Sequence, residues 1–368
     1  MATLTESSVV ARKVIRFGLI GFVGITLLWF LGGVVIKYYR ILYPPPPPPP
    51  EVGFGKVPAI NFPEEEGRPK LSLELPTGAV PAFPDRMAVY KAPTKRSTFG
   101  DDNWAIDAAV SLGFLFEPSQ PTETYYVWTN QDALSSKLEM NIVSRYFELT
   151  RIWQNDPTLI GLAGFTSDKQ AINQAMNILR KGNLLPDDVL KEPQVSYLKS
   201  LGGKMIRALS LSDADFIQID FFRDNAEEVD EETKEVLSSY PFYRPEPARG
   251  LIRIIVSGNR ETGKSIVYIN YDYTDIQYVQ KSNYSVKTGE EAWAELESGG
   301  GFVGLGSPVN GSIKIRRIFL GHYDGDEKRG YVMPVYIFLG DRDFVAYVSA
   351  VKDELIVGKE KTEKVTTK

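Results

Sequence analysis

From about residue 101 to residue 351, the spacing of apolar residues alternates between the periods of strands and helices. Residues 125–128 and 138–149 are rich in β-branched and aromatic side chains and predict strands. Ahead of them, a predicted helix that Gly113 ends carries one apolar face: Trp104, Ala105, Ala108, Ala109 and Leu112. The pattern predicts a folded body in which sheets and helices are mixed.

Two later helices begin with the same local pattern. Ser167 and Gln170 have the spacing of a capping box, and so do Thr288 and Glu291. An apolar stripe follows each pair, with Ala171, Ile172, Ala175, Met176 and Leu179 in the first and Ala292, Trp293 and Leu296 in the second. The repeat predicts two divergent copies of one unit, an antiparallel sheet packed against a helix. The alternative is coincidence, because capped amphipathic helices are common.

Three strand candidates close the body, at residues 313–320, 331–339 and 344–351, and their short connections predict an antiparallel meander. Pro334 lacks a backbone donor, so its strand is predicted to be an edge or to be bulged. An exposed edge can accept a strand from another protein. The candidate partner-binding residues are therefore those along this strand: Tyr331, Met333, Val335 and Ile337.

The chain begins with a different kind of segment. Residues 17–36 form an uncharged run of 20, mostly apolar, which is the length of a helix that crosses a hydrocarbon core of about 30 Å. The run predicts an uncleaved transmembrane signal-anchor; a cleaved leader and a buried core helix are the alternatives. More basic residues precede the run than follow it, which favours a cytoplasmic N-terminus (1–16) and an extracytoplasmic body in the cell membrane.

Seven consecutive prolines, residues 44–50, predict a polyproline II rod. Residues 37–100 as a whole are predicted to be a spacer and an extended connector. The predicted fold class is α+β, with a transmembrane helix, a first unit at 101–190 and a second at 191–351. Residues 352–368 are charged and predict a flexible tail.

Composition narrows the chemistry. The chain has no cysteine and one histidine, so thiolate sites and zinc sites with several histidines are excluded, and we predict no metal and no cofactor. The net charge is −5, and the first 43 residues hold five basic residues against one acidic. The remainder is therefore more acidic still, and nucleic acid is not an expected partner.

One segment, residues 258–265, matches the phosphate-binding pattern GxxxxGK[ST]. A phosphate-binding loop must open a helix, whereas residues 266–273 favour a strand. We therefore predict a hairpin turn between strands at 251–257 and 265–273, and no bound nucleotide. A nucleotide-binding enzyme that uses Gly258 to Ser265 is the rival hypothesis.

The only histidine, His322, stands near Asp324, Asp326 and Glu327. This grouping invites a metal or acid–base hypothesis, but it lacks the spacing of a calcium loop. We predict a solvated turn here, and no catalytic residue anywhere in the chain.

The body resembles PepSY-like domains, in particular the YycH and YycI regulatory proteins of bacteria. Three segments carry the resemblance: residues 167–172 and 288–293, where the two helices begin, and the closing strand 330–338. The resemblance implies a noncatalytic external body that senses or restrains a membrane or envelope protein, such as a sensor kinase or a protease. The proline spacer departs from the family pattern.

The expected function is that of a single-pass envelope protein, held in the lipid bilayer, whose body binds a protein partner or a cell-wall component without catalysis. The alternatives are an enzyme, either a nucleotide-binding enzyme or a hydrolase that uses scattered carboxylates, and a passive structural strut.

Overall fold

The structure is a computed structural model that describes residues 22, 24–34, 37–38, 52–131, 134–160, 165, 167–230, 233–261, 263–325 and 330–358. Internal contacts divide the chain into Met1–Pro50 and Glu51–Lys368. In the described part of the second unit, nineteen strands accompany only three α-helices and three short 3₁₀ helices. The body is thus dominated by β-sheet.

The predicted transmembrane run, residues 17–36, lies partly outside the described residues. Residues 22, 24–34 and 37–38 are helical. Among the described residues, no helix has both the length and the apolar character to cross a membrane. The prediction of a transmembrane signal-anchor, and of the single-pass membrane location built on it, is corrected by this finding. The proline run 44–50 lies outside the described residues.

The first large sheet has nine strands, and every pair of neighbours is antiparallel. In spatial order these are β3 (Ser119–Thr122), β4 (Tyr125–Asn130), β5 (Ser136–Asn141), β6 (Tyr146–Arg151), β14 (Ile266–Tyr271), β13 (Ile252–Ser257), β9 (Phe216–Phe221), β7 (Gln194–Leu201) and β8 (Lys204–Arg207).

Two helices pack on this sheet, α2 (Asp101–Ser111) and α3 (Asp168–Lys181). Their small apolar residues let the backbone approach the strands closely, and they join one core with buried strand residues such as Leu138, Phe147 and Ile219. The apolar spacing predicted both helices, and Gly113 follows α2 with a positive φ of 97°, as its role as a stop requires.

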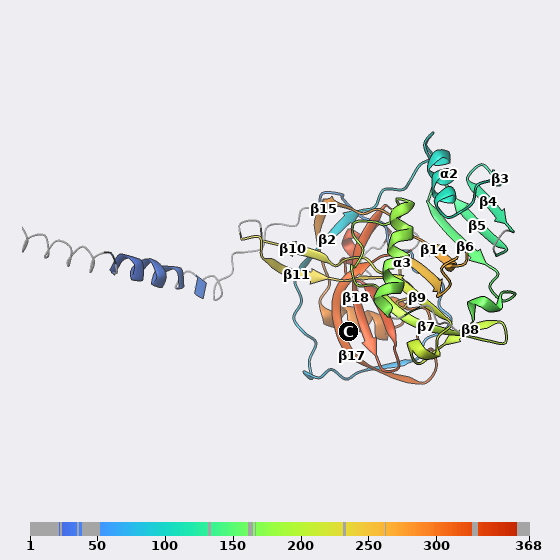
Figure 1. Cartoon of the computed structure of the whole chain (residues 1–368). Helices are drawn as coiled ribbons and strands as arrows, with labels where there is room; N and C mark the ends of the chain where they lie inside the picture. Colours follow the sequence, from blue (N-terminus) through green and yellow to red (C-terminus); the bar gives the residue numbers. More distant parts are fainter. Residues whose placement is uncertain are drawn as a thin grey trace, which may run out of the picture. The chain divides into compact units, whose positions relative to one another are not determined.

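The second large sheet has eight strands. Its main path is β1 (Lys70–Leu73), β17 (Ser312–Tyr323), β18 (Tyr331–Gly340), β19 (Val345–Ser349) and β16 (Phe302–Val303), and three more strands pair beside it, β2 (Arg86–Lys91), β12 (Phe242–Tyr243) and β15 (Gln277–Ser285). Figure 1 shows β17 and β18, in orange to red, beside each other, with β2 and β15 at one end. Helix α4 (Gly289–Glu297) packs against β19.

The remaining elements are small. Strands β10 (Ala226–Val229) and β11 (Val236–Tyr240) form a separate two-stranded sheet, visible in Figure 1. The 3₁₀ helices are η1 (Pro157–Leu159), η2 (Leu211–Asp213) and η3 (Asp353–Leu355).

These sheets correct the predicted fold class. The strands predicted at residues 125–128 and 138–149 correspond to β4 and to the pair β5 and β6, and β3 was not predicted. The sheet of these strands continues without a break into β14, β13, β9 and β7. One sheet therefore spans the proposed boundary at residue 190, and the arrangement of two separate units, each with its own sheet and helix, is wrong. The pattern failed because it records which face of a strand is buried and not which strand lies beside it.

The predicted connector contributes to the core. Residues 70–73 form β1, parallel to β17, and residues 86–91 form β2 between β15 and β18. Val57 and Val89 are completely buried. Part of the predicted tail is also packed, because Ile356 is buried and pairs with Val57. Residues 359–368 lie outside the described part of the chain.

Strand β18 is an inner strand, so the predicted edge is wrong. Pro334 is tolerated there because the ladder needs no donor from it. The Pro334 carbonyl accepts the N–H of Ala350 at 3.0 Å, while the Ala350 carbonyl accepts the N–H of Lys287 at 2.7 Å. A different chain segment thus supplies the hydrogen bond that proline cannot make.

The two predicted capping boxes have different outcomes. At α4 the box is complete: Glu291 donates its N–H to the Thr288 hydroxyl at 3.2 Å, and the Glu291 carboxylate accepts the N–H of Thr288 at 2.8 Å. At α3, Ser167 occupies the N-cap, but its side chain makes no capping hydrogen bond. The capping box is confirmed for α4 and wrong for α3.

Candidate functional site

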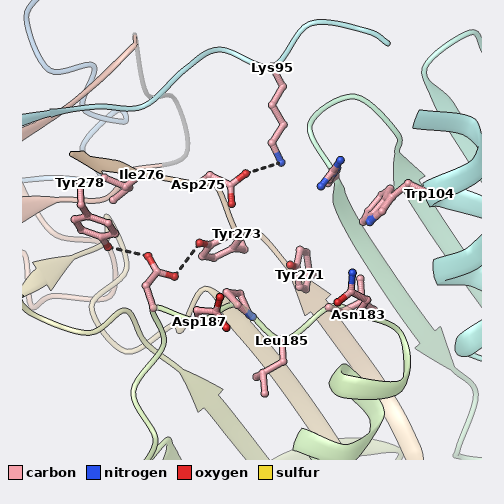
Figure 2. A pocket seen from close by; sticks show the side chains of 14 residues that line it. Lys95, Trp104, Asn183, Leu185, Asp187, Tyr271, Tyr273, Asp275, Ile276 and Tyr278 are labelled. Carbon is pink, nitrogen blue, oxygen red and sulfur yellow. Dashed lines mark hydrogen bonds and ion pairs between the residues drawn. The ribbon is translucent and has the colours of Figure 1, made fainter. Parts of the chain in front are cut away.

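A pocket of about 370 Å³ opens at one end of the nine-stranded sheet, beside the segment that leads to β15 of the second sheet. Figure 2 shows its aromatic side chains, Trp104, Tyr271, Tyr273 and Tyr278. This volume lies in the lower part of the range of about 300 to 1,000 Å³ that is typical of small-molecule sites. Larger cavities of about 670 and 780 Å³ also lie in the described residues, but this pocket combines several aromatic rings with fixed charged groups and is the candidate site.

Regular elements hold two of the aromatic rings. Trp104 lies in the first turn of α2, and Tyr271 ends β14 and stacks on Phe147 of β6 at a centroid distance of 4.8 Å. Tyr273 lies on the connection between β14 and β15, and Tyr278 is the second residue of β15. The pocket thus combines a rigid wall from the first sheet with a wall from the connection between the sheets.

Asp188 organises the polar side of the pocket. It accepts hydrogen bonds from the hydroxyls of Tyr273, at 2.8 Å, and Tyr278, at 2.7 Å, and Figure 2 draws both bonds as dashed lines from the labelled tyrosines. It also forms an ion pair with Arg223, which follows β9. Asp188 therefore fixes the two tyrosines relative to each other and joins them to the end of β9.

Arg223 is completely buried and contacts two carboxylates. Besides Asp188, it pairs with Asp324 at 2.9 Å, and it donates to the Thr274 carbonyl at 2.7 Å. Arg223 follows β9 of the first sheet, and Asp324 follows β17 of the second. Burial alone disfavours its charge, but Asp324 and Asp188 outweigh that effect and raise the pKa of Arg223 well above its ordinary value. The cluster Asp188–Arg223–Asp324 therefore fastens the two sheets together through a permanent charge.

The same surroundings keep the pocket phenols neutral. Burial raises the pKa of Tyr271, Tyr273 and Tyr278, and nearby carboxylates raise it further. Each hydroxyl that donates to Asp188 still has oxygen lone pairs that can accept a hydrogen bond.

Charged and amide side chains form the rest of the lining. Lys95 and Asp275 approach to 3.9 Å (Figure 2), and the Arg145 guanidinium lies 4.9 Å from the centre of the Trp104 ring. Arg145 and Asn183 both have left-handed backbones, with φ of 61° and 52°. Asparagine adopts this conformation readily, whereas arginine does so at a cost. An arginine is thus held at a position where glycine would be less strained.

The carboxylates of the pocket are paired or exposed to solvent. Among the described residues, no group of three histidine, aspartate or glutamate side chains could hold a metal ion. Of the three carboxylates in the pocket, Asp188 accepts three hydrogen bonds, Asp275 is exposed and pairs with Lys95, and Asp187 is exposed. None lies in the apolar enclosure that prepares a carboxyl group to act as a general acid.

His322 lies outside this pocket and is only 1% exposed, so the predicted solvated turn is wrong for it. Its Nε2 lies 2.9 Å from the Ala88 carbonyl, and the ring is surrounded by Tyr90, Tyr240 and Phe242. Burial lowers the pKa of His322 to about 4. Asp324 is also buried, through its pair with Arg223, while Asp326 and Glu327 lie outside the described residues.

The segment that matches GxxxxGK[ST] connects β13 to β14 as an antiparallel hairpin, which confirms the predicted turn. Ser265 leads into a strand, so no helix N-terminus is present to complete a phosphate cradle. The Lys264 ammonium is occupied by Asp156 and Glu261, each at 3.0 Å.

The candidate partner-binding residues lie on β18, within the second sheet. Met333, Val335 and Ile337 are buried, and Tyr331 is partly buried. The structure does not place them at the pocket, and their strand is paired on both sides. The predicted partner binding by these residues required an unpaired strand edge, which β18 does not provide.

Sequence reasoning missed the pocket. Neither the acidic pair Asp187 and Asp188 nor Arg223 belongs to a recognisable sequence motif. The acidic pair follows α3 directly, and three tyrosines occur within residues 271–278. No local pattern shows that these two segments meet, since they are more than eighty residues apart.

Comparisons with known proteins identify no family. No family model matches the chain, and no curated protein matches it significantly. The chain is similar to a crystal structure of an uncharacterized protein from Eubacterium rectale, with 10% identity and a TM-score of 0.33 over 75% of this chain and 85% of that chain. A likeness at this TM-score carries no argument about function, and the resemblance to PepSY-like proteins stays a prediction.

Proposed function

We propose that the body, residues 51–368, is a noncatalytic binding module whose ligand occupies the pocket beside Asp188. The observation that carries this proposal is the combination of an aromatic lining with polar groups that are fixed before any ligand arrives. Tyr273 and Tyr278 are oriented by Asp188, and Asp188 is held by the buried Arg223. A preorganised site of this kind loses little conformational freedom when it binds.

The pocket offers variants that test the proposal without disturbing the fold. Arg145 and Asn183 have left-handed backbones that glycine adopts freely, so Arg145→Gly and Asn183→Gly remove pocket side chains without adding backbone strain. Lys234→Gly is the matched control, because Lys234 has the same backbone conformation, with φ of 59°, and does not line the pocket.

The experiment is a screen of a neutral and charged fragment library against the full chain, by ligand-observed NMR. We expect fragments that bind to the unmodified chain and to Lys234→Gly, and that bind more weakly to both pocket variants. Binders that are unaffected by the pocket variants would contradict the proposal, and so would a complete absence of binders. Conversion of a bound fragment into a product would contradict the noncatalytic part.

A further inference from the structure

We infer that the pocket beside Asp188 binds a ring of a neutral oligosaccharide. This inference rests on the proposed function and gives its ligand a chemical class. It follows from three properties of the pocket: its charge balance, its hydrogen-bonding groups and its aromatic surfaces.

The charges that line the pocket include no net positive charge. Asp188 shares the charge of Arg223 with Asp324, so this buried cluster is negative by one charge. Asp275 lies 3.9 Å from Lys95, and the charges of Arg145 and Asp187 are opposite. An anionic ligand would therefore find no net opposite charge, and it would lose its hydration without compensation. An uncharged ligand has no such penalty.

The hydrogen-bonding groups match hydroxyls, which both donate and accept. The phenol oxygens of Tyr273 and Tyr278 can accept, because their protons are committed to Asp188. The Asn183 side chain offers donors and an acceptor, and Asp187 offers acceptors. A ligand with several neighbouring hydroxyls can satisfy groups of both kinds at once.

The aromatic rings provide the apolar surfaces that a sugar ring needs. The face of an aromatic ring is electronegative and attracts the polarised C–H groups on the face of a sugar. Trp104, Tyr271, Tyr273 and Tyr278 all line the cavity (Figure 2). Because the same cavity also presents hydrogen-bonding groups, it favours a saccharide over a purely apolar molecule.

Other ligand classes fit less well. A phosphate group would meet one guanidinium, Arg145, together with the exposed carboxylates of Asp187 and Asp275. Arg223 is completely buried and bonded to two carboxylates, and Lys95 lies near Asp275.

A peptide strand would need an open sheet edge. Two strands reach the pocket: β14 is paired with β6 on one side and β13 on the other, whereas β15, which carries Tyr278, is paired with β2 alone. The β15 ladder is irregular at Tyr278, whose N–H is bonded to the Ile276 carbonyl, so this edge offers a peptide no regular row of donors.

The test is calorimetric titration of the full chain with three neutral disaccharides: cellobiose, maltose and N,N′-diacetylchitobiose. We expect at least one of them to bind saturably at concentrations below about 10 mM. Removal of one polar partner by Arg145→Gly or Asn183→Gly is expected to weaken that binding about three- to tenfold, while Lys234→Gly leaves it unchanged. Because the ligand is uncharged, its affinity is expected to stay the same when the salt concentration is raised.

The outcomes separate this inference from the proposed function. No saturable binding of any of the three disaccharides, or binding of glucuronate or glucosamine alone, overturns the inference. If fragments still bind in a manner that depends on Asn183, the proposed binding function survives that result. If a disaccharide binds and new reducing ends appear, the saccharide inference stands and the noncatalytic function fails.

Discussion

The two large sheets of the body are assembled from the chain in different ways. The nine-stranded sheet takes all of its strands from residues 119–271 and is antiparallel throughout. The eight-stranded sheet joins residues 70–91 to residues 242–349, and two of its strands, β1 and β12, run parallel to β17. The first sheet is mostly a product of local hairpins, whereas the second depends on partners that are distant in the sequence.

This difference indicates that contacts between segments distant in the sequence contribute strongly to the stability of the body. Arg223 connects the end of β9 to the end of β17, and His322 of β17 contacts the backbone of β2. Four predictions test how much these contacts contribute, from the largest expected effect to the smallest.

The largest effect is expected where the two sheets are fastened. Arg223→Met leaves the Asp324 carboxylate, which is 1% exposed, without its counter-charge. Breaking a buried ion pair in this way lowers the free energy of unfolding by about 3 to 5 kcal/mol. Urea denaturation measures the loss.

The control for Arg223 is an exposed pair on the first sheet. Lys199 and Asp213 lie 2.8 Å apart with side chains 37% and 45% exposed, so Lys199→Met is expected to change the unfolding free energy by less than about 1 kcal/mol. Equal losses from both substitutions would show that the buried cluster does not fasten the sheets.

The second prediction concerns the segment that was expected to be a connector. Met87 on β2 is 3% exposed and belongs to the core of the second sheet. Met87→Ala is expected to lower the free energy of unfolding by about 2 to 5 kcal/mol because it leaves a cavity. Lys91→Ala, on an exposed side chain of the same strand, is expected to change it by no more than about 0.5 kcal/mol. A spacer would tolerate both substitutions equally.

The third prediction is a pH dependence that belongs to the second sheet. His322 is neutral in the folded state down to a pKa of about 4, against an ordinary value of 6.5. The unfolded chain therefore binds a proton between these values when the folded chain does not. The contribution of His322 to the free energy of unfolding is fully present above pH 6.5. It is lost as the pH falls from 6.5 to 4, and the loss is roughly 3 kcal/mol.

His322→Gln isolates this contribution, since glutamine retains a donor for the Ala88 carbonyl but does not titrate. The unfolding free energies of the two proteins are compared by urea denaturation at several pH values. We expect their difference to change across the window from pH 6.5 to 4. A constant difference would mean that the imidazole titrates normally.

The smallest effect distinguishes the two helix starts. Thr288→Ala removes the hydroxyl that accepts the Glu291 N–H, and it is expected to lower the unfolding free energy by about 1 kcal/mol. Ser167→Ala at α3 removes no capping hydrogen bond, so its effect is expected to be close to zero. Thermal unfolding, followed by circular dichroism, measures both. Equal effects would mean that the similar sequences behave alike in spite of their different geometry.

The sequence predicted the elements that depend on local pairing and missed those that depend on distant partners. The hairpin of β13 and β14, the meander of β17, β18 and β19, and the positions of α3 and α4 were all predicted correctly, because each depends on neighbouring residues. The strand status of β1 and β2 could not be predicted, since their short apolar alternation becomes meaningful only beside β17 and β15.

The errors at His322 and at β18 have a related cause. His322 and Asp324 were expected to be solvated because their neighbours in the sequence are polar, but Phe242 and Arg223 come from elsewhere in the chain and cover them. The rule for prolines failed at β18 because Lys287 supplies the missing donor. In each case a group from a distant segment decided the outcome, and a single sequence does not reveal such groups.

The long-range pairing of β1 has a consequence for how the chain is made. Ser72 contacts Ile313, which is 241 residues further along. A ribosome that adds about 5 to 20 residues per second releases β1 roughly ten to fifty seconds before its neighbour emerges. The nine-stranded sheet can be finished in that interval. Strands β1 and β2 would then remain unpaired, and accessible to chaperones, until the last quarter of the polypeptide is synthesised.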